Sequence, residues 1–257
     1  MITGVELFVA AFLASIFGSM VGLGGGFILV PVLRLFFGLG PADAAGTALV
    51  LVVANSLSGS ITYLLQHRVH VRLGLLVAAG GWPGSIAGAV ASQHISPTLF
   101  DVLLAAILVY VSLDMLLRRR KTIAGRQESQ GTADRFGGIS IPAALGIGFG
   151  IGMLSSLFGI GGGTLLVPAF LYFSDLPAHA IGATSHFAIV LTSPVGLAAH
   201  AVEHDIRVSD IAPLVIGGLC GGPLGARLSL RLASKQLLVV VAVALFIGAA
   251  SLVAKHA

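Results

Sequence analysis

The chain has 257 residues, of which 56% are hydrophobic and 9% are charged. Soluble domains carry about 25% charged residues, and a soluble globule of this size cannot hide so much apolar surface from water. The composition excludes a soluble enzyme, a nucleic-acid-binding domain and a disordered chain. It predicts an all-α membrane protein, a polytopic bundle of transmembrane helices. Glycine is also in excess: it makes up 35 of the 257 residues, roughly twice the usual share of about 7%.

The net charge of +4 comes from one hydrophilic stretch, residues 118–138. Its charged residues are Arg118, Arg119, Arg120, Lys121, Arg126 and Arg135, against Glu128 and Asp134. A short basic segment beside an apolar one is typical of a cytoplasmic loop, because membrane proteins keep Lys and Arg on the inner side. We therefore expect this charge to orient the chain in the cytoplasmic membrane, with the lipid bilayer and not nucleic acid as its partner.

Apolar runs follow one another along the chain in two similar sets. The first set covers 5–37, 44–66, 73–92 and 98–117, and the second covers 139–173, 180–202, 210–230 and 235–254. Most of them match the roughly 20 residues that cross a bilayer core as a helix. The first run has no Lys or Arg before it and is longer than a signal peptide, so we expect a retained membrane segment. The expected organisation is an N-terminal transmembrane repeat (1–117), a basic cytoplasmic linker (118–138) and a C-terminal transmembrane repeat (139–257).

The two halves repeat each other in sequence. Residues 19–31 read SMVGLGGGFILVP and residues 156–168 read SLFGIGGGTLLVP, so that the serine, the glycines and the final Leu-Val-Pro recur. The echo continues where Pro41–Thr47 is matched by Pro177–Thr184. A shift of about 137 residues aligns nearly the whole chain, which predicts two copies of one helical unit.

The first run of each half is too long for one crossing. Residues 5–37 would form a helix of about 50 Å, whereas the bilayer core is about 30 Å thick. The glycines at 22–26 and 159–163 are expected to break these helices. If each broken stretch returns to its starting side, the repeats are inverted; if each crosses once, they are parallel. Span length favours the inverted arrangement, and the positive-inside rule is compatible with both.

The two glycine motifs are the first candidate site. They lack the sixth glycine of a dinucleotide fingerprint and the lysine of a phosphate-binding loop. In a membrane, consecutive glycines unwind a helix and free N–H groups, which suit an anion at the start of the next half-helix. The residues expected to bind the substrate here are Gly24, Gly25, Gly26, Phe27, Gly161, Gly162, Gly163 and Thr164. Close helix packing is the alternative role, and we favour it for Gly84–Gly88 and Gly221–Gly225.

Polar residues inside the apolar runs are the second candidate set, because they are costly in lipid and usually face an interior. The residues expected to bind the substrate are Asn55, Ser58, Thr184, Ser185 and His186. No Lys or Arg is expected deep in the runs, so dipoles would hold the anion. His186 either titrates and couples transport to protons or is a neutral packed side chain. Asp101 and Asp114 are expected to be exposed at the two membrane interfaces.

Metal and cofactor chemistry is not expected. The single cysteine excludes an internal disulfide and a cysteine-based metal cluster. His67 and His70 alone are weak evidence for a metal site. Ser185 and His186 are neighbours that point about 100° apart on a helix, which argues against a hydrolase.

The duplicated motifs at Gly22–Pro31 and Gly159–Pro168, with Pro41–Thr47 and Pro177–Thr184, resemble those of the TauE/SafE sulfite exporter family. The resemblance covers the whole chain. It implies export of a small sulfur-containing anion, such as sulfite or sulfoacetate, across the cytoplasmic membrane.

We therefore expect a secondary transporter, not an enzyme, that binds a small anion and works by alternating access without a cofactor. Transport of another small ion or metabolite, or a non-transporting scaffold or sensor, are the alternatives. The coupling ion and a homo-oligomeric state are left open.

Overall fold

A computed structural model describes residues 4–118, 138–229, 243 and 246–252. This part of the chain is helical and contains no β-strand. The elements are α1 (Gly4–Val21), α2 (Gly26–Phe36), α3 (Pro41–Leu65), α4 (Val71–His94), α5 (Pro97–Arg118), α6 (Ile141–Phe158), α7 (Gly163–Phe173), α8 (Ala178–Val202), the 3₁₀ turn η1 (Val208–Asp210) and α9 (Ile211–Leu228). Within the described residues, 6 helices are long and apolar enough to cross a membrane. The predicted class, an all-α polytopic membrane protein, is confirmed.

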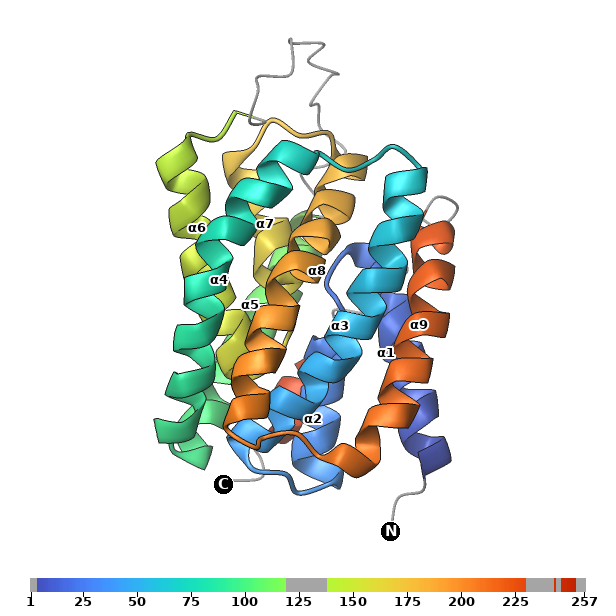
Figure 1. The fold of residues 1–257 in the computed structure, drawn as a ribbon, viewed down its shortest axis with the longest axis vertical. Helices are drawn as coiled ribbons and strands as arrows, with labels where there is room; N and C mark the ends of the chain where they lie inside the picture. Colours follow the sequence, from blue (N-terminus) through green and yellow to red (C-terminus); the bar gives the residue numbers. More distant parts are fainter. Residues whose placement is uncertain (1–3, 119–137, 230–242, 244–245, 253–257) are drawn as a thin grey trace.

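The two glycine motifs break helices as predicted. Helix α1 ends at Val21, and Gly22, Gly24 and Gly25 have φ angles of 83°, 87° and 84° before α2 starts. This left-handed region is open to glycine and strained for other residues. Helix α2 then runs back toward the end of the bundle from which α1 started (Figure 1). The pair α1–α2 is therefore a hairpin and not a single crossing.

The second half repeats this path from the other end. Helices α6, α7 and α8 have the bounds of α1, α2 and α3 shifted by 137 residues. Helix α1 begins at the lower end of the bundle and α6 at the upper end (Figure 1). The contacts match as well, because α6 packs on α4 as α1 packs on α9, and α8 packs on α4 as α3 packs on α9. This is the path that inverted repeats require, although the inverted relation itself stays a prediction.

Part of the expected organisation falls outside the described residues. Apart from its end residues, the predicted linker 118–138 is not described, and neither is most of the last apolar run, 235–254.

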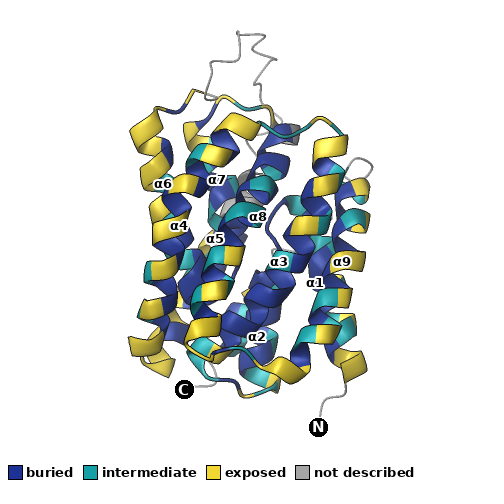
Figure 2. Ribbon diagram, in the orientation of Figure 1, coloured by how far each residue is buried: buried dark blue, intermediate teal, exposed yellow. Residues whose placement is uncertain are grey.

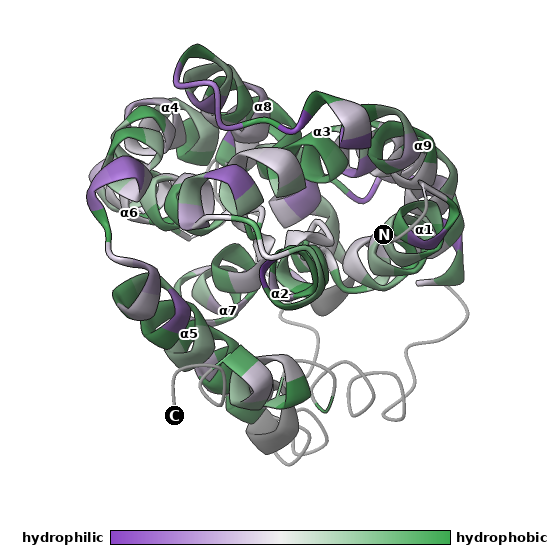
Figure 3. Cartoon of the chain, turned by 90° about the horizontal axis from the view of Figure 1, so that it is seen from below, coloured by the Kyte–Doolittle hydropathy of each residue, from purple (hydrophilic) through white to green (hydrophobic). Residues whose placement is uncertain are grey.

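Apolar side chains cover the outside of the bundle. Leu13, Ile61, Ile86 and Phe149 are all exposed, and exposed residues lie on the outer faces of the helices (Figure 2). Seen along the bundle, hydrophobic residues make up most of the helices, and hydrophilic ones lie at helix ends and in connecting segments (Figure 3). In water such a surface would be a liability; in a bilayer it faces lipid, as expected of a membrane protein.

One expectation about charge was wrong. Asp101 was expected at the membrane interface, but it is fully buried beside Arg34 of α2, itself 4% exposed. The Arg34 Nε and Nη2 groups donate to Asp101 Oδ1 and Oδ2 at 2.7 and 2.6 Å. An arginine therefore does lie inside the protein, with its charge matched by a carboxylate. The side chain of Asp114 lies outside the described set.

Candidate functional site

The two glycine loops, 22–26 and 159–163, cross in direct contact. A methyl group added at Gly24 would lie 3.2 Å from the Gly161 carbonyl oxygen. The contact is closer on either side, where methyls at Gly26 and Gly163 would each lie 2.3 Å from the carbonyl oxygens of Gly159 and Gly22. The structure thus brings together two motifs that are far apart in the sequence, and only glycine permits this approach.

Both loops are held between the long helices α3 and α8. The side chain of Val52 on α3 lies against Gly26 and Gly161, and that of Ile189 on α8 lies against Gly24 and Gly163. The crossing is therefore enclosed by one helix from each repeat.

Each loop leads into the N-terminus of a short helix. The Ile28 and Leu29 amides donate to the Gly25 carbonyl at 3.2 and 3.4 Å, and those of Leu165 and Leu166 donate to Gly162 at 3.0 and 2.8 Å. The N-terminal ends of α2 and α7 carry the partial positive charge of a helix dipole. Such ends favour anions.

The first side chains of these two helices differ. Thr164 on α7 is fully buried, and its hydroxyl has no hydrogen-bond partner. The matching residue on α2 is Phe27, which is 1% exposed. Only α7 therefore offers a side-chain donor beside its N-terminus.

A buried polar cluster lies beside the crossing and joins it to α1, α3 and α8. Asn55 Nδ2 donates to the Gly24 carbonyl at 3.0 Å. The Ser19 hydroxyl donates to Asn55 Oδ1 at 2.7 Å and lies 3.3 Å from His186 Nε2. All three side chains are fully buried. We call Ser19, Asn55 and His186 the polar cluster.

The hydrogen bonds of the polar cluster leave one ring nitrogen of His186 unused. Its Nε2 faces the Ser19 hydroxyl and the Asn55 carbonyl, the latter at 3.4 Å, whereas Nδ1 is buried without a partner. The Asn55 carbonyl can only accept, so a neutral His186 ring carries its hydrogen on Nε2 and leaves Nδ1 as an acceptor. A buried acceptor without a partner costs free energy, and a ligand group that donates a hydrogen bond could satisfy it.

Two neighbours complete the surroundings of His186. Ser60 donates to the His186 carbonyl at 3.1 Å, and the Tyr63 ring stands edge-on to the imidazole at 5.7 Å. The Tyr63 hydroxyl donates to the Ser19 carbonyl. Ser19 and Tyr63 were not among the predicted site residues. A serine opens both motifs, at Ser19 and at Ser156, and this recurrence could have pointed to Ser19.

The other predicted polar residues take different places. Ser185 donates to the Gly22 carbonyl at 3.1 Å and so belongs to the crossing. Ser58 bonds the carbonyls of its own helix and that of Gly218 on α9 at 3.2 Å, away from the loops. The Thr184 hydroxyl accepts from the His70 amide at 3.0 Å and holds the turn that leads into α4.

Metal ligands do not gather in the part of the chain that the structure describes, where no three His, Cys, Asp or Glu residues come together.

A helical bundle built from two sequence repeats, with two broken helices crossing inside it, is a recurrent architecture of membrane transporters. The chain belongs to the family described as Sulfite exporter TauE/SafE, whose model matches residues 7–252.

Curated relatives of the chain bear the names of transporters. The probable membrane transporter protein YunE of Bacillus subtilis is 31% identical over 258 residues, which cover 95% of this chain and 94% of the relative. A probable membrane transporter protein of Xylella fastidiosa (strain 9a5c) is 31% identical over 89% of this chain and 88% of its own. MJ0441 of Methanocaldococcus jannaschii, also a probable membrane transporter protein, is 27% identical over 74% of this chain and 70% of its own. No solved structure matches the chain.

Proposed function

We propose that the protein exports a small sulfur-containing oxyanion, sulfite or an organosulfonate such as sulfoacetate, across the cytoplasmic membrane by alternating access. The observation that carries the proposal is the contact between the two glycine loops, with the polar cluster beside it. The name of the family supports a sulfur oxyanion.

The chemistry of the crossing suits an anion that must also leave. Helix N-termini, the Thr164 hydroxyl and the second amide hydrogen of Asn55 offer donors without a fixed charge. The buried Arg34 is not available as a counter-ion, because Asp101 already binds it. An anion held by dipoles keeps a moderate affinity, and transport requires release as well as binding.

Substrate entry requires the loops to separate. At the crossing, the backbone of one loop lies against the backbone of the other, so an ion cannot sit between Gly26 and Gly159 while they touch. Binding at this place is therefore tied to a movement of one repeat against the other. This link between occupancy and movement is what alternating access needs.

The distribution of charge supports an orientation of the protein in the membrane, and the membrane potential then favours export of an anion. Arg68 lies between α3 and α4, Arg72 at the start of α4, and Arg227 at the end of α9. These helix ends are at the upper end of the bundle, where α5 leads toward the basic linker, whereas α8, which Glu203 and Asp205 follow, ends at the lower end (Figure 1). By the positive-inside rule the upper end faces the cytoplasm. An anion that leaves an inside-negative cell gains about 2.3 kcal/mol per charge per 100 mV.

Vesicles reconstituted with the purified protein and loaded with labelled sulfite test the proposal. Wild-type protein should release sulfite faster when the inside is negative. Asn55→Ala removes the contact with Gly24 and should slow release on the order of tenfold, because it leaves buried groups unpaired. Ser56→Ala is the matched control, since the Ser56 hydroxyl is buried on the same helix but bonds only the Val53 carbonyl of that helix.

The outcomes separate the alternatives. If both variants release sulfite at the wild-type rate, the polar cluster is not the binding site. If the wild-type protein releases another anion but neither sulfite nor sulfoacetate, the substrate class is wrong. A folded protein that moves no anion favours a scaffold or sensor.

A further inference from the structure

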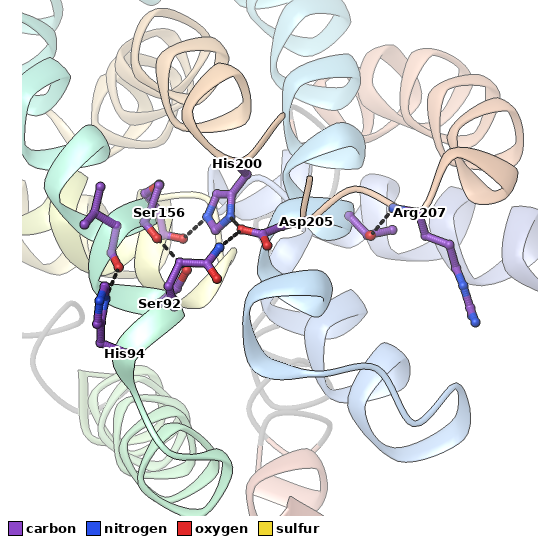
Figure 4. A network of polar contacts seen from close by, with 10 residues as sticks. Ser92, His94, Ser156, His200, Asp205 and Arg207 are labelled. Atoms are coloured by element: carbon purple, nitrogen blue, oxygen red, sulfur yellow. Dashed lines mark hydrogen bonds and ion pairs between the residues drawn. The ribbon is translucent and has the colours of Figure 1, made fainter. Parts of the chain in front are cut away.

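A second buried polar network lies near the end of α8, at the lower end of the bundle (Figure 1), and Figure 4 shows it from close by. His200, near the end of α8, is fully buried, and its Nδ1 lies 2.9 Å from Asp205 Oδ2. Its Nε2 lies 2.9 Å from the Ser156 carbonyl oxygen, at the end of α6. Gln93 on α4 donates to the same Asp205 oxygen at 2.5 Å.

Counting hydrogens in this network shows an extra proton. A backbone carbonyl can only accept, so the bond to Ser156 needs a hydrogen on His200 Nε2. The bond to Asp205 needs a second hydrogen, between Nδ1 and Oδ2. A neutral imidazole carries one N–H and an ionised carboxylate carries none. The pair therefore holds one proton more than a neutral histidine beside an ionised aspartate.

Other elements packed on His200 bring no competing charge to it. Helix α3 approaches through Gly46, where an added methyl would lie 3.1 Å from the His200 Cβ. Helix α6 contributes the Ser156 carbonyl, and α4 contributes the neutral Gln93.

The other ionisable groups of α4, of the start of α3 and of residues 203–210 have other surroundings. His94 on α4 is bonded to the Val90 carbonyl at 3.0 Å, and Asp210 accepts from Ser209 at 2.9 Å. The Arg207 side chain points away from His200 (Figure 4). Asp43, Glu203 and His204 are exposed.

In the first repeat, a tyrosine stands in the position of His200 and holds the matching backbone carbonyl. Tyr63, Arg68 and Ser19 stand 137 residues before His200, Asp205 and Ser156. The Tyr63 hydroxyl donates to the Ser19 carbonyl, and the Arg68 guanidinium lies 5.4 Å over the Tyr63 ring. Each repeat thus ties down the carbonyl three residues before its glycine loop. A phenol keeps its proton at neutral pH, whereas histidine is the side chain that exchanges one between about pH 5 and 8.

We infer that the His200–Asp205 pair is a proton-binding site that holds the end of α6, and that release of its proton frees the second glycine loop to move. When the proton leaves, the one hydrogen left on the ring stays on Nδ1, because a hydrogen bond to a carboxylate is stronger than one to a backbone carbonyl. The bond from Nε2 to the Ser156 carbonyl is then lost. The freed end of α6 is adjacent to Gly159, where the loop begins. As far as transport is concerned, this inference rests on the proposed function, and it makes the proton the coupling ion. In the orientation proposed above, the pair lies at the outer end of the bundle.

Hydrogen exchange of the protein in lipid nanodiscs tests the proton site without any substrate. In the wild-type protein, protection of the amides at 153–158 should fall on the order of tenfold as the pH rises from about 5 to about 8, because a hydrogen bond of the protonated pair is lost. His200→Tyr copies the first repeat, so its protection should be independent of pH. Tyr63→Phe is the matched control, because it should loosen the end of α1 equally at both pH values.

Flat protection in the wild-type protein, or a wild-type pH dependence in His200→Tyr, would overturn the inference. If the tyrosine does not fold, His200→Gln supplies a donor without a titrating proton and should give the same flat profile. In vesicles, anion release by wild-type protein should follow a pH gradient, and release by the variant should not. A protein that moves no anion but shows the exchange result keeps the proton site and refutes the proposed function.

Discussion

The substitution Gly26→Ala measures how closely the two loops approach. An added methyl would lie 2.3 Å from the Gly159 carbonyl oxygen, 2.8 Å from Val52 Cγ2 and 2.9 Å from the Ile160 carbonyl carbon. Ordinary contact begins near 3.4 Å, so the loops must part by roughly 1 Å. Overpacking of this kind costs about 1–3 kcal/mol. The same change at the matching Gly163, whose methyl would lie 2.3 Å from the Gly22 carbonyl oxygen, should cost about as much.

Thermal unfolding of the purified protein in detergent measures the effect. We expect the midpoint to fall by about 2–4 °C per kcal/mol in a chain of this size. The control is Gly146→Ala on the outer face of α6, where an added methyl has no neighbour within 4 Å. It should leave the midpoint unchanged or raise it, since alanine favours helix over glycine by about 1 kcal/mol. If Gly26→Ala has the same unfolding midpoint and the same transport rate as the wild-type protein, the described contact between the loops is wrong.

Two further predictions concern buried charge and lipid contact. Asp101→Leu leaves Arg34 buried without its carboxylate and should destabilise the protein by about 3–5 kcal/mol. Adding Arg34→Met should recover most of this loss in thermal unfolding. Equal stability of the single and double variants would contradict the pairing. Trp82, the single tryptophan of the chain, is 48% exposed on α4. Lipids brominated on their acyl chains should therefore quench its fluorescence. Unquenched emission would mean that this face of α4 is covered by protein.

The breaks in the helices could be predicted from the sequence because their cause is local. Gly22, Gly24 and Gly25 adopt a left-handed backbone that glycine alone tolerates well, and the motif at 159–163 does the same. The length of the first apolar run added that a single crossing would be too long. The helical hairpins therefore follow from residue types and chain length.

The contents of the candidate site could be predicted only in part. Asn55 and Ser185 do bond the first glycine loop, and His186 lies beside the crossing in the polar cluster. A polar residue in a membrane helix is kept where it can be buried against protein. Ser58 and Thr184 satisfy the same pattern but bond elsewhere. A pattern of polar residues shows that a helix has an inner face, but not which part of that face meets a given loop.

Contacts between residues that are distant in the sequence could not be predicted. Asp101 near the start of an apolar run gives no sign of Arg34 on another helix. His200 and Ser156 are 44 residues apart, and their contact exists because α8 passes the end of α6. The same holds for the contact between His200 and Asp205, since it depends on how the segment after α8 folds back on the ring.

Hydropathy, chain length and backbone preference act locally, so the residues alone predict two similar sets of membrane helices with two glycine breaks. The contact between the two breaks, and the different ways in which the repeats hold their broken helices, are seen only in the packed bundle. Tyr63 and His200 occupy matching positions, yet their hydrogen-bond partners become visible only when the helices are packed. The physical reason is that a hydrogen bond or an ion pair depends on distance in space, which the order of residues along the chain does not specify.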